Sequence, residues 1–160
     1  MTKLPGNCYS MLSLYDVEKA VGHRIAGKTV FIVGLPDKTI GRLTYVNCRY
    51  GVASTAAKSS PPIEINVALY KTPATAQRRY ENTIRDYVAN GATSTEVTVS
   101  GQPAAILTGG IGAAYRVPLL VAAAGQRTVA VSLNDTSVAP ADRTRILTAL
   151  GTLALTNSEG

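Results

Sequence analysis

The stretch from residue 71 to residue 91, KTPATAQRRYENTIRDYVANG, is the clearest helix in the chain, and the other segments are best explained as a sheet around it. Thr72 can cap the first turn with its hydroxyl, and Pro73 suits the first helical position because its missing N–H costs nothing there. Gly91 tolerates the positive φ that often ends a helix. One apolar stripe follows the helical period: Ala76, Tyr80, Ile84, Tyr87 and Val88. The stretch therefore predicts a long helix that covers one face of a sheet.

The segment 63–70, IEINVALY, is the clearest strand because its apolar and more polar residues alternate. Its apolar side carries Ile63, Ile65, Val67 and Leu69, and its other side carries Glu64, Asn66, Ala68 and Tyr70. We therefore expect one buried face and one that is at least partly wet. Further strands are predicted at 29–35, 43–50, 95–99, 103–108, 113–123 and 127–133.

Turn and cap signals arrange these elements into a single domain over residues 1–160. Ser13 and Asp16 predict a capped short helix that ends at Gly22, and a terminal helix is expected from about Pro140. Pro118 cannot donate to a strand ladder, so its strand is expected at an edge or bulged. Hairpins make the last four strands antiparallel. The predicted fold class is α+β: a single twisted, mostly antiparallel sheet with the long middle helix and a C-terminal helix packed on it.

The composition is that of a folded protein, with 46% hydrophobic and 16% charged residues. The net charge is +6, but the basic residues are scattered, and their densest cluster is the pair Arg78–Arg79. We therefore predict a soluble basic surface and no nucleic-acid partner. The apolar segment 117–124 is too short to span a membrane, and residues 1–6 lack the apolar run of a signal peptide. The sequence is thus expected to be either cytosolic or the mature part of an exported chain.

Few residues suggest catalysis or metal binding. Cys8 and Cys48 could form one disulfide in an oxidising compartment or remain two buried thiols in the cytosol. Neither stands in a C-x-x-C motif, and one histidine cannot complete a typical zinc site, so no metal is expected. That histidine, His23, would have to serve any Ser/His/Asp or Cys/His scheme. Its place directly after a predicted helix is more typical of a surface or capping residue.

Two further patterns resemble functional motifs without fulfilling them. The segment 108–112, TGGIG, joins two predicted strands, and no helix N-terminus or GK[ST] sequence follows, so we predict a wide hairpin turn. Glu64 and Glu96 could act as a carboxylate pair only if their strands were neighbours. Solvated strand positions are the better interpretation of both. We expect no cofactor and assign no catalytic residue.

The candidate ligand-binding residues share one predicted sheet face. If Val46 and Cys48 point to the core, the other side of the two strands carries Tyr45, Asn47, Arg49, Glu64, Asn66 and Tyr70. Tyrosine rings mixed with arginine and asparagine suit a small amphiphile, a glycan or a partner protein. The same residue types are also good exposed-strand residues. We expect any site on the sheet face or rim that helix 71–91 leaves uncovered, and we interpret Arg78 and Arg79 as solvated.

Two short motifs resemble a known family. Residues 6–17, GNCYSMLSLYDV, with 20–22, AVG, resemble the PCxLLxxxDVxxALG opening of a family of actinobacterial exported lipoproteins of unknown function. Residues 48–50, CRY, are similar to its C-R/K-W strand, with Tyr50 in place of tryptophan, and Gly101 to Ala104 are similar to its G-x-x-A strand pair. The resemblance implies an envelope protein in which Cys8 pairs with Cys48 and ties residues 1–12 to the sheet. The family offers no catalytic residues, and residues 4–8, LPGNC, do not fit a lipidation site.

These observations support two main functional hypotheses, beside a third interpretation as an interaction module with no pocket. The first is a non-enzymatic exported cell-envelope domain, extracellular or in the envelope, that binds a small apolar or glycolipid-like ligand or a partner protein. The alternative is a small cytosolic enzyme of the cyclase or isomerase type with a pocket lined by tyrosine and arginine. The sequence identifies neither the ligand nor the oligomeric state.

Overall fold

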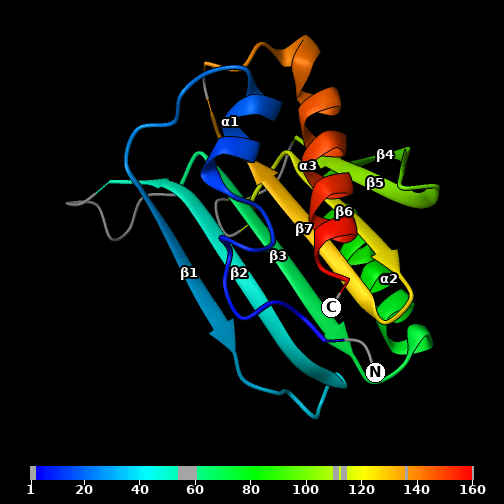
Figure 1. The fold of residues 1–160 in the computed structure, drawn as a ribbon. Coiled ribbons are helices and arrows are strands. Elements are labelled where there is room, and N and C mark those ends of the chain that lie inside the picture. The colour runs from blue at the N-terminus through cyan, green and yellow to red at the C-terminus, as the bar shows by residue number, and fades with distance from the viewer. Residues whose placement is uncertain (1–2, 54–60, 110–111, 113–114, 136, 160) are drawn as a thin grey trace.

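The computed structural model describes residues 3–53, 61–109, 112, 115–135 and 137–159, and Figure 1 shows their arrangement. Within these residues, seven strands form one antiparallel sheet in the order β1-β2-β3-β7-β6-β5-β4. The strands are β1 (Lys28–Gly34), β2 (Arg42–Val52), β3 (Ile63–Tyr70), β4 (Thr93–Val99), β5 (Gln102–Thr108), β6 (Leu119–Ala124) and β7 (Arg127–Leu133). The helices are α1 (Leu14–Val21), α2 (Pro73–Ala89), the short 3-10 helix η1 (Pro140–Asp142) and α3 (Arg143–Asn157). The predicted α+β class with one antiparallel sheet and a C-terminal helix is confirmed.

The helices cover the two faces of the sheet differently. Helices α1 and α3 lie on one face, and α2 lies on the other (Figure 1). Helix α3 packs mainly on β7 and β6 and also contacts α1, whereas α2 packs mainly on β6 and β7. On the α2 face, the part of the sheet formed by β1 and β2 therefore has no helix above it.

The predicted caps occur at both helix starts. The Thr72 hydroxyl accepts a hydrogen bond from the Thr75 N–H at 3.1 Å, and Gly91 adopts a φ of 107° just after α2. Ser13 and Asp16 form a reciprocal capping box at α1, which ends at Gly22. The stripe of α2 is narrower than predicted, because Val88 is 46% exposed. Its other members pack on the sheet: Ala76, Tyr80, Ile84 and Tyr87.

The prediction for Pro118 was wrong in its placement. Strand β6 begins only at Leu119, so Pro118 stands just outside the ladder and its missing N–H costs no strand hydrogen bond. The strand itself is internal, between β5 and β7, rather than at an edge. The predicted strand 113–123 also includes residues 113 and 114, which lie outside the described residues.

The larger core lies between the sheet and the α1–α3 layer. Fully buried residues of β2, β3 and β7 meet the apolar sides of both helices there: Val46, Ile65, Val67, Val131, Val17, Ile146, Leu147 and Leu150. The predicted inward residues of β3 and β7 are thus inward in the structure. A smaller apolar cluster lies under α2 and contains Ala105, Leu107, Leu119 and Val121.

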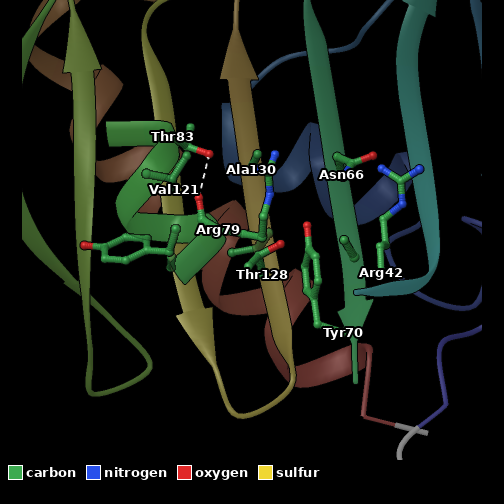
Figure 2. A pocket seen from close by; sticks show the side chains of 12 residues that line it. Arg42, Asn66, Tyr70, Arg79, Thr83, Val121, Thr128 and Ala130 are labelled. Carbon is green, nitrogen blue, oxygen red and sulfur yellow. Dashed lines mark hydrogen bonds between the residues drawn. The ribbon is translucent and has the colours of Figure 1, made fainter. Parts of the chain in front are cut away.

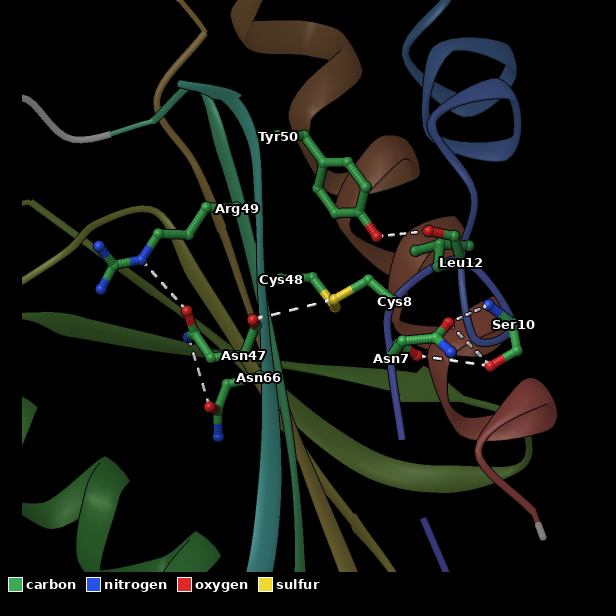
Figure 3. Close-up of a disulfide and its surroundings, with 9 residues drawn as sticks. All are labelled: Asn7, Cys8, Ser10, Leu12, Asn47, Cys48, Arg49, Tyr50 and Asn66. Atoms are coloured by element: carbon green, nitrogen blue, oxygen red, sulfur yellow. Dashed lines mark hydrogen bonds between the residues drawn. A yellow bond between two sulfur atoms is a disulfide. The ribbon is translucent and has the colours of Figure 1, made fainter. Parts of the chain in front are cut away.

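Two bonds attach the N-terminal segment to β2 (Figure 3). Cys8 and Cys48 form a disulfide, both are fully buried, and their Cα atoms are 5.8 Å apart. Two residues further along the same face of β2, the Tyr50 hydroxyl donates to the Leu12 carbonyl oxygen at 2.5 Å. Burial, with a smaller contribution from Asp16, raises the pKa of Tyr50, so its hydroxyl stays protonated and remains a donor. These bonds hold residues of the irregular N-terminal segment against the core.

Removing the disulfide is expected to destabilise the protein strongly. The bridge closes a loop with a sequence separation of 40 residues, which the chain-entropy model values at about 4 kcal/mol. In a domain of this size, that loss lowers the melting temperature by about 10 °C. We expect this shift in the Cys8→Ala/Cys48→Ala double variant by calorimetry. Adding reductant should leave the double variant unchanged, and a double variant that melts with the wild type would contradict the prediction.

Removing the Tyr50 hydroxyl is expected to cost about 1–3 kcal/mol, because Tyr50→Phe leaves the Leu12 carbonyl buried without its partner. Urea unfolding followed by circular dichroism measures this loss. Tyr9→Phe is the matched control, since the Tyr9 side chain is 63% exposed. Equal stability of the two variants would show that the bond to Leu12 does not matter.

Candidate functional site

The six candidate ligand-binding residues lie on the same side of the sheet as α2. Tyr45, Asn47 and Arg49 alternate with the buried Val46, Cys48 and Tyr50 of β2, and their partners on β3 are Ala68, Asn66 and Glu64. The opposite face is covered by α1, α3 and the N-terminal segment. The set thus shares the α2 face: its β2 members lie beyond the helix, whereas Tyr70 packs against the helix residue Ala76. Alternation along a strand separates two faces, but it does not say which helix covers which.

Glu64 holds together the outer part of this set. Its carboxylate pairs with Arg116 and with Arg49, whose Nε lies 2.8 Å from Glu64 Oε2. Arg49 also donates to Asn47 Oδ1 at 3.1 Å, and Asn47 Nδ2 donates to Asn66 Oδ1 at 3.4 Å. With 14% of its side chain exposed, Glu64 is the centre of an ion-pair cluster and not the solvated position predicted.

The second carboxylate of the suggested pair lies far from the first. Glu96 is on β4, and strands β7, β6 and β5 separate it from the strand that carries Glu64. Glu64 and Glu96 therefore cannot act together on one substrate as a glycosidase-type pair does.

The inner part of the set surrounds an apolar contact near the start of α2. Tyr70 is buried, and it packs with Ala68 and Ala76 beside the half-buried Tyr45. The Arg42 guanidinium lies over the Tyr45 ring, 4.5 Å from its centroid. Gly34 on β1 makes room for that ring, because a Cβ at this position would lie 1.6 Å from the ring carbon Cε1.

A cavity of about 200 Å³ opens between the first half of α2 and strands β3, β7 and β6 (Figure 2). Its polar lining side chains are Arg42, Asn66, Tyr70, Arg79, Tyr80, Thr83 and Thr128, and small residues such as Ala68 and Ala130 form its floor. Burial raises the pKa of Tyr80, with Glu96 and Glu81 adding to the effect, so this hydroxyl is protonated. The cavity can therefore offer several donors to a ligand.

The sequence identified two of these lining residues, Asn66 and Tyr70, and missed the two arginines. Arg79 was interpreted as solvated with Arg78, but it is half-buried against the cavity, while Arg78 is exposed. Its position three residues after Ala76 and four before Thr83 borders the apolar stripe, which is the signal that could have identified it. Arg42 was missed because strict alternation would place it with Thr44 and Val46. The pairing shifts between Arg42 and Thr44 and puts Arg42 opposite Tyr70.

His23 takes part in a polar cluster that lacks the geometry of a catalytic triad. Its Nε2 lies 2.9 Å from Asp135 Oδ2 and 2.8 Å from the Ser137 hydroxyl, and its Nδ1 lies 2.9 Å from the Arg24 carbonyl oxygen. In a triad, the carboxylate and the hydroxyl occupy opposite ring nitrogens. Here both share Nε2, so the carboxylate does not orient the ring for proton transfer from the serine. The cluster connects the loop after α1 to the segment after β7.

The other motifs offer no catalytic or metal-binding group in the described residues. Both cysteines are consumed by the disulfide. The turn predicted at 108–112 includes residues 110 and 111, which lie outside the described residues. In the described part of the chain, no three histidine, cysteine or acidic side chains come together as a metal site would require. Of the helices described, none has both the length and the apolar content to cross a membrane.

Comparison with known proteins adds little to this geometry. No family model matches the chain, and no curated protein matches it. Among solved structures, the chain is similar to the extracellular domain of PknH from Mycobacterium tuberculosis, with a TM-score of 0.45 and 10% sequence identity over 92% of this chain and 97% of that chain. A similarity of this size carries no argument about function.

Proposed function

We propose that this chain is a non-enzymatic, exported domain of the cell envelope that binds a small amphiphilic ligand in the cavity beside α2. The observation that carries the proposal is the cavity itself, which combines a floor of small residues with polar side chains on its walls. Ligand sites in proteins combine a mostly preformed hollow with a few polar groups that fix orientation.

The disulfide supports the exported location. Structural disulfides persist in oxidising compartments and are rare in the cytosol. The bond between Cys8 and Cys48 is fully buried and joins the N-terminal segment to the core, so it belongs to the architecture of the domain. An actinobacterial envelope lipoprotein, as the motif resemblance implies, remains part of this proposal.

The chemistry of the cavity supports binding rather than catalysis. Its described lining includes no histidine, cysteine, aspartate or glutamate, which are the commonest general acids, bases and nucleophiles. The cytosolic cyclase or isomerase considered above would have to use tyrosine, arginine, asparagine and threonine side chains.

Filling the cavity is expected to abolish ligand binding. In the Ala130→Leu variant, a larger side chain would rise from the β7 part of the floor and occupy the space of the ligand. We expect native mass spectrometry of wild-type protein exported to an oxidising compartment to show a bound small molecule, and the variant to lack it. Ala89→Leu is the matched control, because Ala89 is exposed at the far end of α2.

Two results would overturn the proposal. One is a wild-type protein that carries no small molecule and whose melting temperature rises with no member of an amphiphile panel. The other is free thiols in the exported protein, which would remove the argument for the compartment. If Ala130→Leu retained the ligand, the proposed location of the site would be wrong.

A further inference from the structure

Two arginines from separate elements line the cavity. Arg42 is the first residue of β2, Arg79 lies in the second turn of α2, and both line the hollow. In the view of Figure 2, their side chains stand on either side of Tyr70. Each guanidinium carries a permanent positive charge and about five N–H donors in a planar fork. The cavity therefore has two positive charges on its walls.

One buried donor of each arginine lacks a partner among the described residues. Arg42 Nε and Arg79 Nε are buried and make no hydrogen bond to any described residue. Neither guanidinium forms an ion pair with a carboxylate in the described part of the chain. A buried charged donor without a partner raises the free energy of the folded state, so such groups are rare in native proteins.

Three other arginines, by contrast, form ion pairs with acidic residues. Arg49 and Arg116 share Glu64, and the buried Arg127 pairs with Glu159. Arg42 and Arg79 therefore differ from these three arginines in having no carboxylate partner among the described residues.

Asp37 is an acidic residue that is influenced by the charges of both arginines, but its side-chain hydrogen bonds stay within its own turn. Asp37 accepts hydrogen bonds from the side chain and the backbone N–H of Thr39. These two bonds are the main reason that its pKa is lowered, and Arg42 and Arg79 add a smaller effect. The positive charges of Arg42 and Arg79 thus act on Asp37 through space, but Asp37 forms no ion pair with either arginine.

An irregularity of the β2 backbone determines where the Arg42 side chain lies. The register shift between Arg42 and Thr44 turns the arginine to the cavity side of β2, as bulges commonly do near functional sites. The Tyr45 ring then supports the guanidinium from below by a cation–π contact. Gly34 is needed for that ring position. Three local features therefore combine to hold one charged group at the cavity.

Resting on the proposed binding function, we infer that the ligand carries an oxyanion, such as a phosphate, sulfate or carboxylate group, held between Arg42 and Arg79. Arginine forks match the planar spacing of such oxygens. The buried Tyr70 hydroxyl and the Asn66 amide offer further donors at the same cavity. A hollow of about 200 Å³ is smaller than the sites of drug-sized ligands, so it suits a charged head group and leaves the rest of an amphiphile outside.

Calorimetric titration of the oxidised wild-type protein tests this inference. The probes are hexyl phosphate, inorganic phosphate and the neutral hexyl glucoside. We expect both phosphates to bind and the glucoside to bind at least about tenfold more weakly than hexyl phosphate. A tighter complex with hexyl phosphate than with inorganic phosphate would identify a lipid-like head group as the source of the oxyanion, and equal affinities would identify the free anion.

Charge-removing variants locate the oxyanion. Arg42→Gln and Arg79→Gln are each expected to weaken hexyl phosphate binding by about tenfold or more. Arg78→Gln, the exposed neighbour on the same helix, should change it little. Arg79→Lys keeps the charge but loses the fork, so an intermediate affinity is expected. Circular dichroism melts of each variant separate loss of binding from loss of folding.

The outcomes distinguish this inference from the proposed function. Equal weakening by Arg78→Gln and Arg79→Gln would indicate only a general effect of charge and would overturn the inference. If the glucoside bound as tightly as the phosphate and Ala130→Leu abolished both, the cavity would be a ligand site but not an oxyanion site. If no probe bound and no molecule co-purified, both proposals would fail.

Discussion

The bond between Cys8 and Cys48 is the constraint on which the rest of the structure depends. The first twelve residues have no helical or strand period of their own, yet Leu4, Met11 and Leu12 are buried in the main core. Helix α3 packs mainly over β6 and β7, so the core side of β2 needs another cover. The disulfide and the bond from Tyr50 to Leu12 are two residues apart on one face of β2, and together they hold the N-terminal segment there.

Anchoring one face of β2 in this way determines what the other face can do. With Val46, Cys48 and Tyr50 buried, Tyr45, Asn47 and Arg49 must point to the α2 side. Helix α2 packs on strands β3 to β7 of that side and leaves β1 and β2 uncovered, and the cavity forms beside this boundary. The polar residues on this face then divide in two. Around Glu64 they form ion pairs with one another, and at the cavity Arg42 and Arg79 form none with a described carboxylate.

Local features of the fold could be predicted from the sequence, and features that depend on distant residues could not. The Ser13 and Thr72 caps, the alternation of β3 and the antiparallel hairpin of β4 and β5 depend on neighbours in the chain, and each appears in the structure. The cluster at Glu64 requires Arg116, which is 52 residues away. Whether α2 shares a face with Tyr45 is likewise a tertiary question. The disulfide came from a family resemblance, because two cysteines alone leave buried thiols as an alternative.

Arg42 and Arg49 lie on the same strand, and a shift in strand pairing leads to a different role for each. An odd spacing of seven residues would put them on opposite faces of a regular strand, and the shift after Arg42 puts both on the α2 side. Arg49 meets Glu64 there and becomes part of the scaffold. Arg42 meets the ring of Tyr45, which supports a cation without neutralising it. An aromatic ring leaves the positive charge of Arg42 available, whereas a carboxylate would cancel it. The end of β2 that carries Arg42, rather than the end that carries Arg49, is therefore suited to an anionic ligand.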